Sequence, residues 1–99
     1  MSLASTWVQM YQERHNFALE EARAHALAKL NTKLGSSCTR ADLWRWEGGG
    51  GMTKERRGFI MNDVLPYIIE RHFPAGPDGA GLKRKPTAKE IADLVDRLV

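Results

Sequence analysis

The chain has 99 residues, of which 42% are hydrophobic and 27% charged, and its net charge is +3. A chain of this length forms one domain with a modest core, and it contains no apolar run of the roughly 18 residues that a membrane-spanning helix requires. The single cysteine, Cys38, excludes an internal disulfide and, with no secretory leader at the start of the sequence, favours the cytoplasm as the compartment.

Positive charge gathers in two parts of the chain. Residues 39–57 and residues 82–99 each carry an excess of two positive charges, whereas residues 58–81 carry an excess of two negative charges. Basic regions favour acidic partners, nucleic acid among them, although a mixed charged surface facing solvent explains the same distribution.

The apolar spacing predicts an all-α protein, because no alternating β-branched run is long enough to form a strand. A first short helix is expected over residues 6–14. Its inner side carries Trp7, Met10 and Tyr11.

A second helix is expected after Asn16, which is predicted to be its N-cap because Glu20 and Glu21 follow near the positive end of the helix dipole. Gly35 is expected to end this helix, since glycine is favoured just past a helix C-terminus. The inner stripe recurs every three or four residues and consists of Leu19, Arg23, Ala26, Leu27, Leu30 and Leu34.

Thr39 and Asp42 form a variant of the capping box, with aspartate in place of the usual glutamate. They predict a short third helix, which the four glycines at 48–51 bring to an end. Projection of this helix at about 100° per residue places Leu43 and Trp46 together on one side. The opposite side carries Arg40, Ala41, Trp44 and Arg45. One tryptophan is therefore expected in the core and the other at the surface.

Thr53 is expected to cap a fourth helix that begins at Lys54. Pro66 interrupts the pattern of this helix, because proline lacks an amide hydrogen and clashes with the preceding turn. Either Pro66 kinks one helix, or Asp63 caps a new helix with Pro66 in its first turn.

Glycine and proline predict a linker over residues 74–86, which ends in the basic run LKRKP. Thr87 and Glu90 form a capping box for a last helix. The apolar stripe of that helix consists of Ile91, Leu94, Val95 and Leu98. We therefore expect a helical domain over residues 1–73, the linker, and a C-terminal amphipathic helix over residues 87–99.

The stretch LNTKLGSSCTRADLWRWEGGG resembles the helix-turn-helix of the Cro and phage-repressor class of regulators. The residues that match the family pattern are Leu30, Leu34, Gly35, Leu43, Trp46, Glu47 and Gly49. Two features depart from it: Asn31 stands where the family has a small alanine, and the stretch from Gly35 to Trp46 is two residues longer than usual. The resemblance implies a compact bundle of four to five helices that contains a helix-turn-helix.

The resemblance also implies a transcriptional regulator that binds double-stranded DNA and reads the major groove with residues 39–47. Arg40 and Arg45 are the candidate base readers, because a guanidinium fork binds guanine O6 and N7 together. Trp44 is expected either to contact a thymine methyl group or a sugar, or to pack under the tail. The candidate phosphate contacts are Ser36, Ser37, Thr39, Lys54, Arg56, Arg57, Lys83, Arg84 and Lys85.

Several roles stay open at this point. The four glycines either let backbone amides approach the DNA backbone or form a flexible connector, and the basic tail either binds phosphate or is a solvated charge run. Glu47 is expected to pair with a nearby arginine or to cap the turn. A homodimer is expected, since such regulators bind palindromic half-sites, with either the last helix or residues 59–73 at the interface.

The sequence predicts no enzyme, no metal or other cofactor and no small-molecule substrate. His15, His25 and His72 are expected to lie far apart, without the spacing that zinc hydrolases use, and Cys38 lacks an obvious base. The alternative to a DNA-binding regulator is a small helical module of phage or plasmid origin that binds and modulates another protein. An exposed Trp44 and an apolar last helix suit such an interface.

Overall fold

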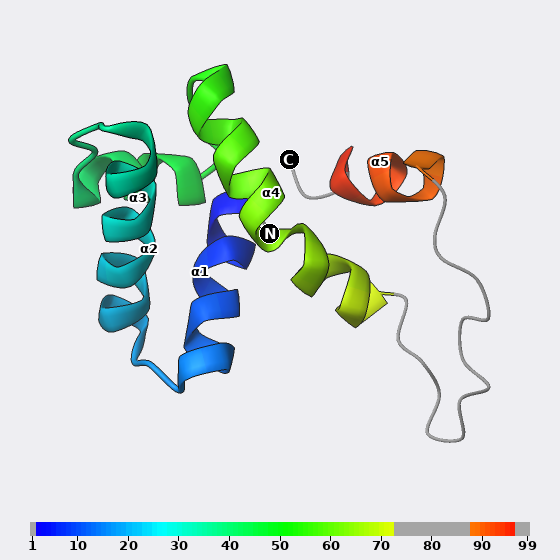
Figure 1. Cartoon of the computed structure of the whole chain (residues 1–99), viewed down its shortest axis with the longest axis horizontal. Coiled ribbons are helices and arrows are strands. Elements are labelled where there is room, and N and C mark those ends of the chain that lie inside the picture. The colour runs from blue at the N-terminus through cyan, green and yellow to red at the C-terminus, as the bar shows by residue number, and fades with distance from the viewer. Residues whose placement is uncertain (1, 73–87, 97–99) are drawn as a thin grey trace.

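A computed structural model of the chain describes residues 2–72 and 88–96 (Figure 1). All regular structure in these ranges is helical, as predicted. The helices are α1 (Leu3–His15), α2 (Leu19–Leu34), α3 (Arg40–Glu47), α4 (Lys54–His72) and α5 (Ala88–Asp96). None of these helices is long and apolar enough to cross a membrane.

Helix α1 begins three residues earlier than predicted, because Ser2 caps it: the Ser2 hydroxyl accepts a hydrogen bond from the Ser5 amide at 3.1 Å. At the other end, Asn16 adopts the left-handed conformation, with φ at 55°, and its amide donates to the carbonyl of Gln12. The prediction that Asn16 caps the start of α2 is therefore wrong. Asn16 ends α1, since asparagine tolerates the left-handed region better than most residues.

Helix α2 starts from Ala18, whose amide donates to the carboxylate of Glu21 at 3.3 Å. Gly35 ends the helix with φ at 62°, which confirms the predicted C-cap. The buried residues of α2 are Ala22, Ala26, Leu27 and Leu30. Leu19, which the stripe placed inside, is 42% exposed, because it is the first residue after the turn from α1.

The core lies where α1 packs against α2, α3 and α4 (Figure 1). The largest fully buried side chains are Trp7, Trp46, Met10, Leu30, Leu43, Ile60, Ile68, Val8 and Val64. The predicted inner side of α1 is confirmed, since Trp7, Met10 and Tyr11 are all buried. Burial of each large apolar side chain contributes about 1.5–3 kcal/mol, so these few residues supply most of the hydrophobic stabilisation.

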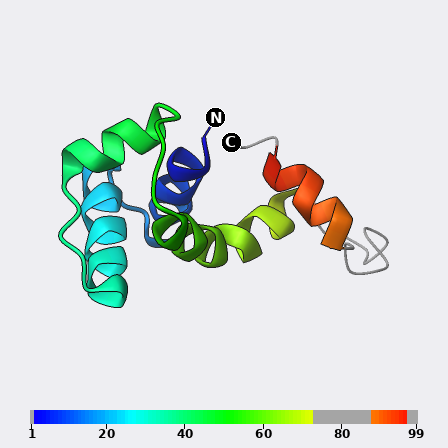
Figure 2. The ribbon, with the colours of Figure 1, turned by 90° about the horizontal axis from the view of Figure 1, so that it is seen from above.

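Helix α4 runs without a break from Lys54 to His72, with Pro66 inside it. The alternative in which Asp63 caps a new helix is therefore excluded. The ribbon of α4 changes direction along its length (Figures 1 and 2), because Pro66 cannot donate a hydrogen bond to the preceding turn and its ring crowds that turn.

Helix α5 lies on the side of the second half of α4, away from α2 and α3 (Figure 2). Phe73, the predicted linker over residues 74–86 and the predicted cap Thr87 lie outside the described residues. The division of the chain at these positions, and the packing of the apolar stripe that predicted the last helix, stay predictions.

Candidate nucleic-acid interface

Helix α3 is fixed at its start by the predicted capping box. The Asp42 carboxylate accepts a hydrogen bond from the Thr39 amide at 2.9 Å, and the Thr39 hydroxyl accepts one from the Asp42 amide at 3.4 Å. A helix of eight residues is marginal in isolation. Its capping and its buried side therefore decide whether it forms.

The two tryptophans of α3 lie on opposite sides, as predicted. Leu43 and Trp46 are fully buried, whereas Trp44 is 59% exposed. The guanidinium of Arg56, from the first turn of α4, lies 5.9 Å from the Trp46 ring. The buried side anchors α3 and leaves its other side facing solvent.

Both ends of α3 are paired with the first turns of α2. Arg40 forms an ion pair with Glu20, and Glu47 accepts two hydrogen bonds from Arg23, the shorter at 3.1 Å. The expectation that Glu47 pairs with an arginine is confirmed. These pairs place α3 across the N-terminal half of α2.

The connection between α2 and α3 runs back along α2 (Figure 2). It has five residues, 35–39, whereas the turn of a helix-turn-helix usually has three to four. Asn31 holds it: its side-chain oxygen accepts from the Cys38 amide and the Ser36 hydroxyl at 2.9 Å, and its side-chain nitrogen donates to the Cys38 carbonyl at 3.0 Å. The two departures from the family pattern were Asn31 and the longer connection. They are parts of one feature, since the side chain of Asn31 orders that connection.

The two candidate base readers differ in their freedom. The side chain of Arg45 is 58% exposed and donates to Asp42 at 3.1 Å. The Arg40 side chain is 37% exposed, is held by Glu20, and lies with its guanidinium 6.0 Å from the Trp44 ring. Arg45 is therefore the more exposed of the two and is paired only within α3, whereas Arg40 is held by α2.

Asp42 is an acidic residue of this surface, as is the exposed Glu55 in the first turn of α4. The hydrogen bond from the Thr39 backbone lowers the pKa of the Asp42 carboxyl group, and the charges of Arg45 and Arg56 lower it further. Asp42 therefore stays ionised at neutral pH and holds positive side chains from both α3 and α4 beside it.

The first turn of α4 adds three cations near this surface. The Thr53 hydroxyl accepts from the Arg56 amide at 3.3 Å, which confirms Thr53 as the cap. Lys54 is exposed, and Arg56 and Arg57 are half-buried. None of the three forms an ion pair with a carboxylate of the described residues.

The remaining predicted contacts are dispersed. Ser36 is half-buried and its hydroxyl is engaged by Asn31, while Ser37 is exposed. The basic run Lys83, Arg84 and Lys85 lies outside the described residues. Of the candidates at the start of α4, Arg56 contacts α3, with its guanidinium 5.9 Å from the ring of the buried Trp46.

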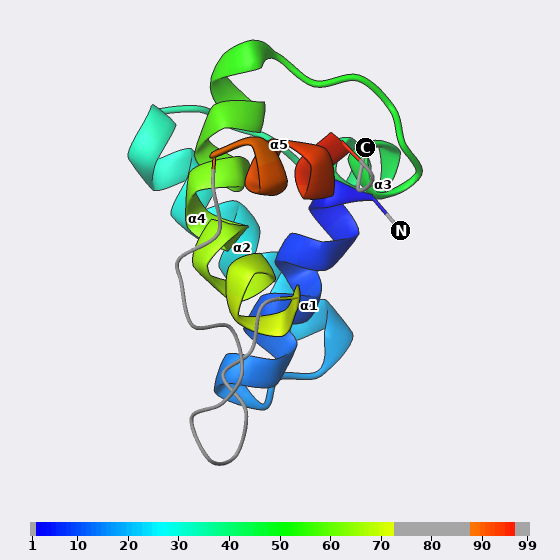
Figure 3. The same cartoon turned by 90° about the vertical axis from the view of Figure 1, so that its right-hand side faces the viewer.

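The glycines between α3 and α4 form a defined turn, which arches over one end of the bundle (Figure 3). The amides of Gly48, Gly49 and Gly50 donate to carbonyls of Trp44, Trp46 and Arg45, respectively, at 2.8–3.1 Å. Gly49 has φ at 90°, a conformation that other residues rarely adopt. Because these three amides already donate hydrogen bonds within the chain, they are not free to bind phosphate. The same hydrogen bonds mean that the three glycines are not a flexible connector.

A second cluster, absent from the sequence analysis, lies between α1, α2 and α4. The rings of His15 and His25 are 5.1 Å apart, next to Tyr11 and Phe17. The expectation that these two histidines lie far apart is wrong, because the turn between α1 and α2 places the end of one helix beside the start of the next. The signal in the sequence was the short turn at residues 16–18, because two helices joined by so short a turn lie side by side and bring His15 close to His25.

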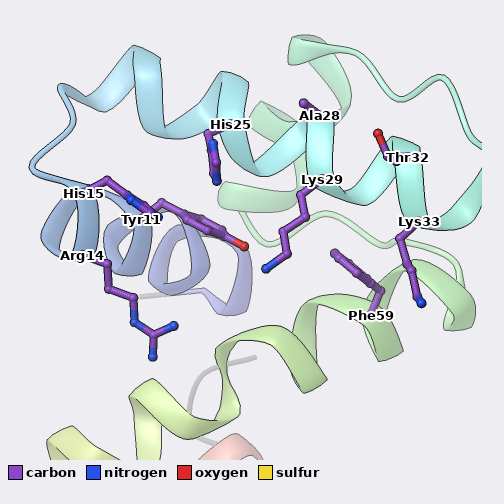
Figure 4. Close-up of a pocket in the computed structure, with 9 residues that line it drawn as sticks. All are labelled: Tyr11, Arg14, His15, His25, Ala28, Lys29, Thr32, Lys33 and Phe59. Atoms are coloured by element: carbon purple, nitrogen blue, oxygen red, sulfur yellow. The ribbon is translucent and has the colours of Figure 1, made fainter.

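This cluster borders an open groove of about 1040 Å³ (Figure 4). Its lining residues are Tyr11, Arg14, His15, His25, Ala28, Lys29, Thr32, Lys33 and Phe59. No set of three or more potential metal ligands occurs within residues 2–72 and 88–96.

Asp63 lies beside the groove and accepts hydrogen bonds from Trp7 at 2.9 Å, from Lys29 at 2.8 Å and from the Tyr11 hydroxyl. Burial alone would raise the pKa of its carboxyl group, but the three donors outweigh burial and leave the pKa below its usual value. Asp63 therefore links α1, α2 and α4 as an ionised carboxylate.

Comparison with family models, with curated proteins and with solved structures gave no match.

Proposed function

We propose that this chain is a sequence-specific regulator of the bacterial or phage helix-turn-helix type, which binds double-stranded DNA with the outer side of α3. One observation carries the proposal. Trp44 and Arg45 project into solvent from a short helix whose other side is fully buried. An α-helix with its side chains is about 10–12 Å in diameter, which fits a major groove about 12 Å wide.

The proposed roles follow from the freedom of each side chain. Arg45 reads guanine through its two parallel donors after exchanging its bond to Asp42 for the base edge. Arg40, held by Glu20, contacts the backbone and orients Trp44 toward a thymine methyl group or a sugar. Arg40 is therefore the weaker base reader of the two.

Lys54, Arg56 and Arg57 bind phosphates in this proposal. They stand at the start of α4, where the positive end of the helix dipole adds to their charge. The Arg56 guanidinium lies 5.9 Å from the Trp46 ring, which links the start of α4 to α3.

The test is selection of bound duplexes from a random pool, followed by fluorescence anisotropy on the selected and scrambled duplexes at several salt concentrations. Arg45→Ala is expected to weaken binding to the selected duplex by about 1–3 kcal/mol and to relax preference at one base pair. Arg57→Ala is expected to weaken all duplexes alike and to reduce the salt slope by about 1. Arg14→Ala is the matched control, because it removes an exposed arginine outside this surface.

Two outcomes decide against parts of the proposal. If the wild-type protein selects no duplex above non-specific binding, the DNA-binding function is wrong. If it selects a duplex but Arg45→Ala keeps the same preference, α3 is not the reading element.

A protein-binding module is the second candidate, and a specific observation favours it. Leu19 and Trp44 are the exposed large hydrophobic residues of the described chain, and the Glu20–Arg40 pair links their helices. Tryptophan and arginine are enriched in the energetic centres of protein interfaces. Binding that barely changes between low and moderate salt, and that Trp44→Ala abolishes, would identify this function instead.

We also propose that the protein acts as a homodimer. The buried side of α4 is occupied by the core of its own chain. Leu65 and Ile69 lie four residues apart on α4 and are half-buried, so they are the apolar residues proposed to meet a partner, together with α5.

A further inference from the structure

We propose that the groove between α1, α2 and α4 binds an anionic small molecule with a planar aromatic ring. The groove shares no residue with the proposed DNA surface on α3 and at the start of α4. It is therefore a separate site.

The shape and lining of the groove favour a planar ring. The rings of Tyr11 and His15 are nearly parallel, at 11° and 5.9 Å, and the His25 ring lies 4.8 Å from that of Tyr11. Phe59, from α4, lines the groove further along, on the far side of Lys29 from these rings (Figure 4). Tyr11 is itself buried, with the Lys29 ammonium 5.4 Å over its ring. The exposed rings of His15 and His25 are therefore the ones that can contact a flat apolar ring, through stacking and edge contacts.

The charge of the groove favours an anion. Arg14 and Lys33 are exposed, and neither forms an ion pair with a carboxylate of residues 2–72 or 88–96. Figure 4 shows them toward opposite ends of the groove, with Lys29 between them. Unpaired cations at the rim of an aromatic groove are complementary to a negatively charged group.

The carboxylates near the groove either accept hydrogen bonds from neighbouring side chains or do not line the groove. Asp63 accepts three hydrogen bonds and is paired with Lys29. Glu13, beside Arg14 in a smaller adjoining pocket, is bound by Arg71 and Tyr67. Glu70, also in that pocket, is exposed and is not one of the residues that line the groove. The charge that remains available in the groove is positive.

The extent of the groove favours a small molecule over a protein. Its volume of about 1040 Å³ is at the upper end of the range for small-molecule sites, which is about 300–1,000 Å³. Nine residues line it, whereas each partner in a protein–protein interface usually contributes roughly 20–30.

The test uses naphthalene-2-sulfonate as the probe, with naphthalene-2-sulfonamide as its neutral analogue and inorganic sulfate as the charge without the ring. Binding is followed by backbone amide chemical shifts of the full chain. The sulfonate is expected to shift the lining residues with saturation and to bind about tenfold more tightly than the sulfonamide, while sulfate alone produces no saturable shift there.

Two double variants distinguish binding of the sulfonate in the groove from nonspecific attraction between the sulfonate and a positively charged protein. The double variant Arg14→Gln/Lys33→Gln is expected to weaken sulfonate binding by about tenfold. Lys54→Gln/Arg57→Gln makes the same charge change on the proposed DNA surface and is expected to change it by less than about twofold. Thermal melts confirm that both variants fold, which is expected because all four side chains lie at the surface or are only half-buried.

Three results would overturn the inference. They are equal affinity for the sulfonate and the sulfonamide, equal effects of the two double variants, and shifts that do not map to the groove. An acidic amphipathic peptide is tested as a competitor. If it displaces the sulfonate and shifts residues well beyond the lining of the groove, the ligand is a protein partner and the small-molecule proposal is wrong.

Discussion

Trp46 and Trp44 show how two copies of one residue, two positions apart, take different roles. Trp46 is buried at 1% exposure and Trp44 is exposed at 59%. The indole nitrogen of Trp46 is buried without a hydrogen-bond partner within the described residues, so its contribution comes from packing and not from polar contacts.

Trp46→Ala is expected to lower the free energy of unfolding by about 3–5 kcal/mol, because it leaves a large cavity between α3 and its neighbours. Trp44→Ala is expected to cost much less. Trp46→Phe is expected to cost less than Trp46→Ala, since the lost N–H had no partner. Urea unfolding of the three variants measures these differences, and equal losses for the two alanine variants would contradict the assigned register of α3.

Asp63 is the residue that couples three helices through polar contacts. Its folded pKa is below the value of about 3.9 expected in an unfolded chain. Its contribution to stability is therefore complete above about pH 4 and is lost as the pH falls through the lowered folded pKa.

Asp63→Asn is expected to destabilise the fold at neutral pH by about 1–3 kcal/mol, because Lys29 and Tyr11 lose a charged acceptor. The unfolding free energy of this variant should also depend less steeply on pH below about 4 than that of the wild type. Chemical denaturation between neutral and acidic pH measures both effects. Asp93→Asn, at an exposed position of α5, is the control, and identical pH profiles for Asp63→Asn and the wild type would refute the assigned role.

At the scale of the elements, the turn after α3 distinguishes glycines that the structure requires from glycines that it does not. A Cβ atom at Gly50 would lie 2.5 Å from Cγ and 2.7 Å from the carbonyl oxygen of Arg45. A Cβ atom at Gly51 would meet no atom within 4 Å. The close approach at Gly50 accompanies its hydrogen bond to the Arg45 carbonyl, which closes the helix.

Gly50→Ala is expected to destabilise the fold by about 1–3 kcal/mol, because the turn must open to admit the methyl group. Gly51→Ala is expected to be neutral or to stabilise slightly, since alanine restricts the unfolded chain. Thermal melts of the two variants decide the matter. If both variants melt at the wild-type temperature, the four glycines are an unstructured connector after all.

At the scale of the whole molecule, the bundle has two separate surfaces. The outer side of α3, with the start of α4, is the proposed DNA surface, and the groove between α1, α2 and α4 is the other. The unbroken α4 contributes to both, with cations at its start and Phe59 one turn further on.

The proposed homodimer is also a property of the whole molecule. Sedimentation equilibrium is expected to give twice the mass of the chain, and Leu65→Glu/Ile69→Glu is expected to give the monomer, because the charges disrupt the apolar stripe of α4. Glu70→Gln, an exposed change on the same helix, is the control. A wild-type monomer at all concentrations would exclude the homodimer.

The sequence by itself determined the features that depend on neighbours along the chain. Helical periodicity, the Thr39 and Thr53 caps, the Gly35 stop and the inner side of α3 are confirmed, because each rests on interactions within a turn or two of helix. Asn16 was assigned to the wrong helix, since a residue between two helices has the chemistry to cap either one and only its backbone conformation decides.

Only the tertiary structure decided which distant residues meet. His15 lies beside His25, Phe59 of α4 lines the same groove, and Asp63 bonds Trp7 and Lys29 across three helices. No local pattern encodes these contacts, because they depend on the angles at which whole helices pack. The pairing of Arg40 with Glu20 has the same origin: the sequence placed both arginines of α3 on one exposed side, but the crossing of α3 over α2 fixed Arg40 and left Arg45 paired only within α3.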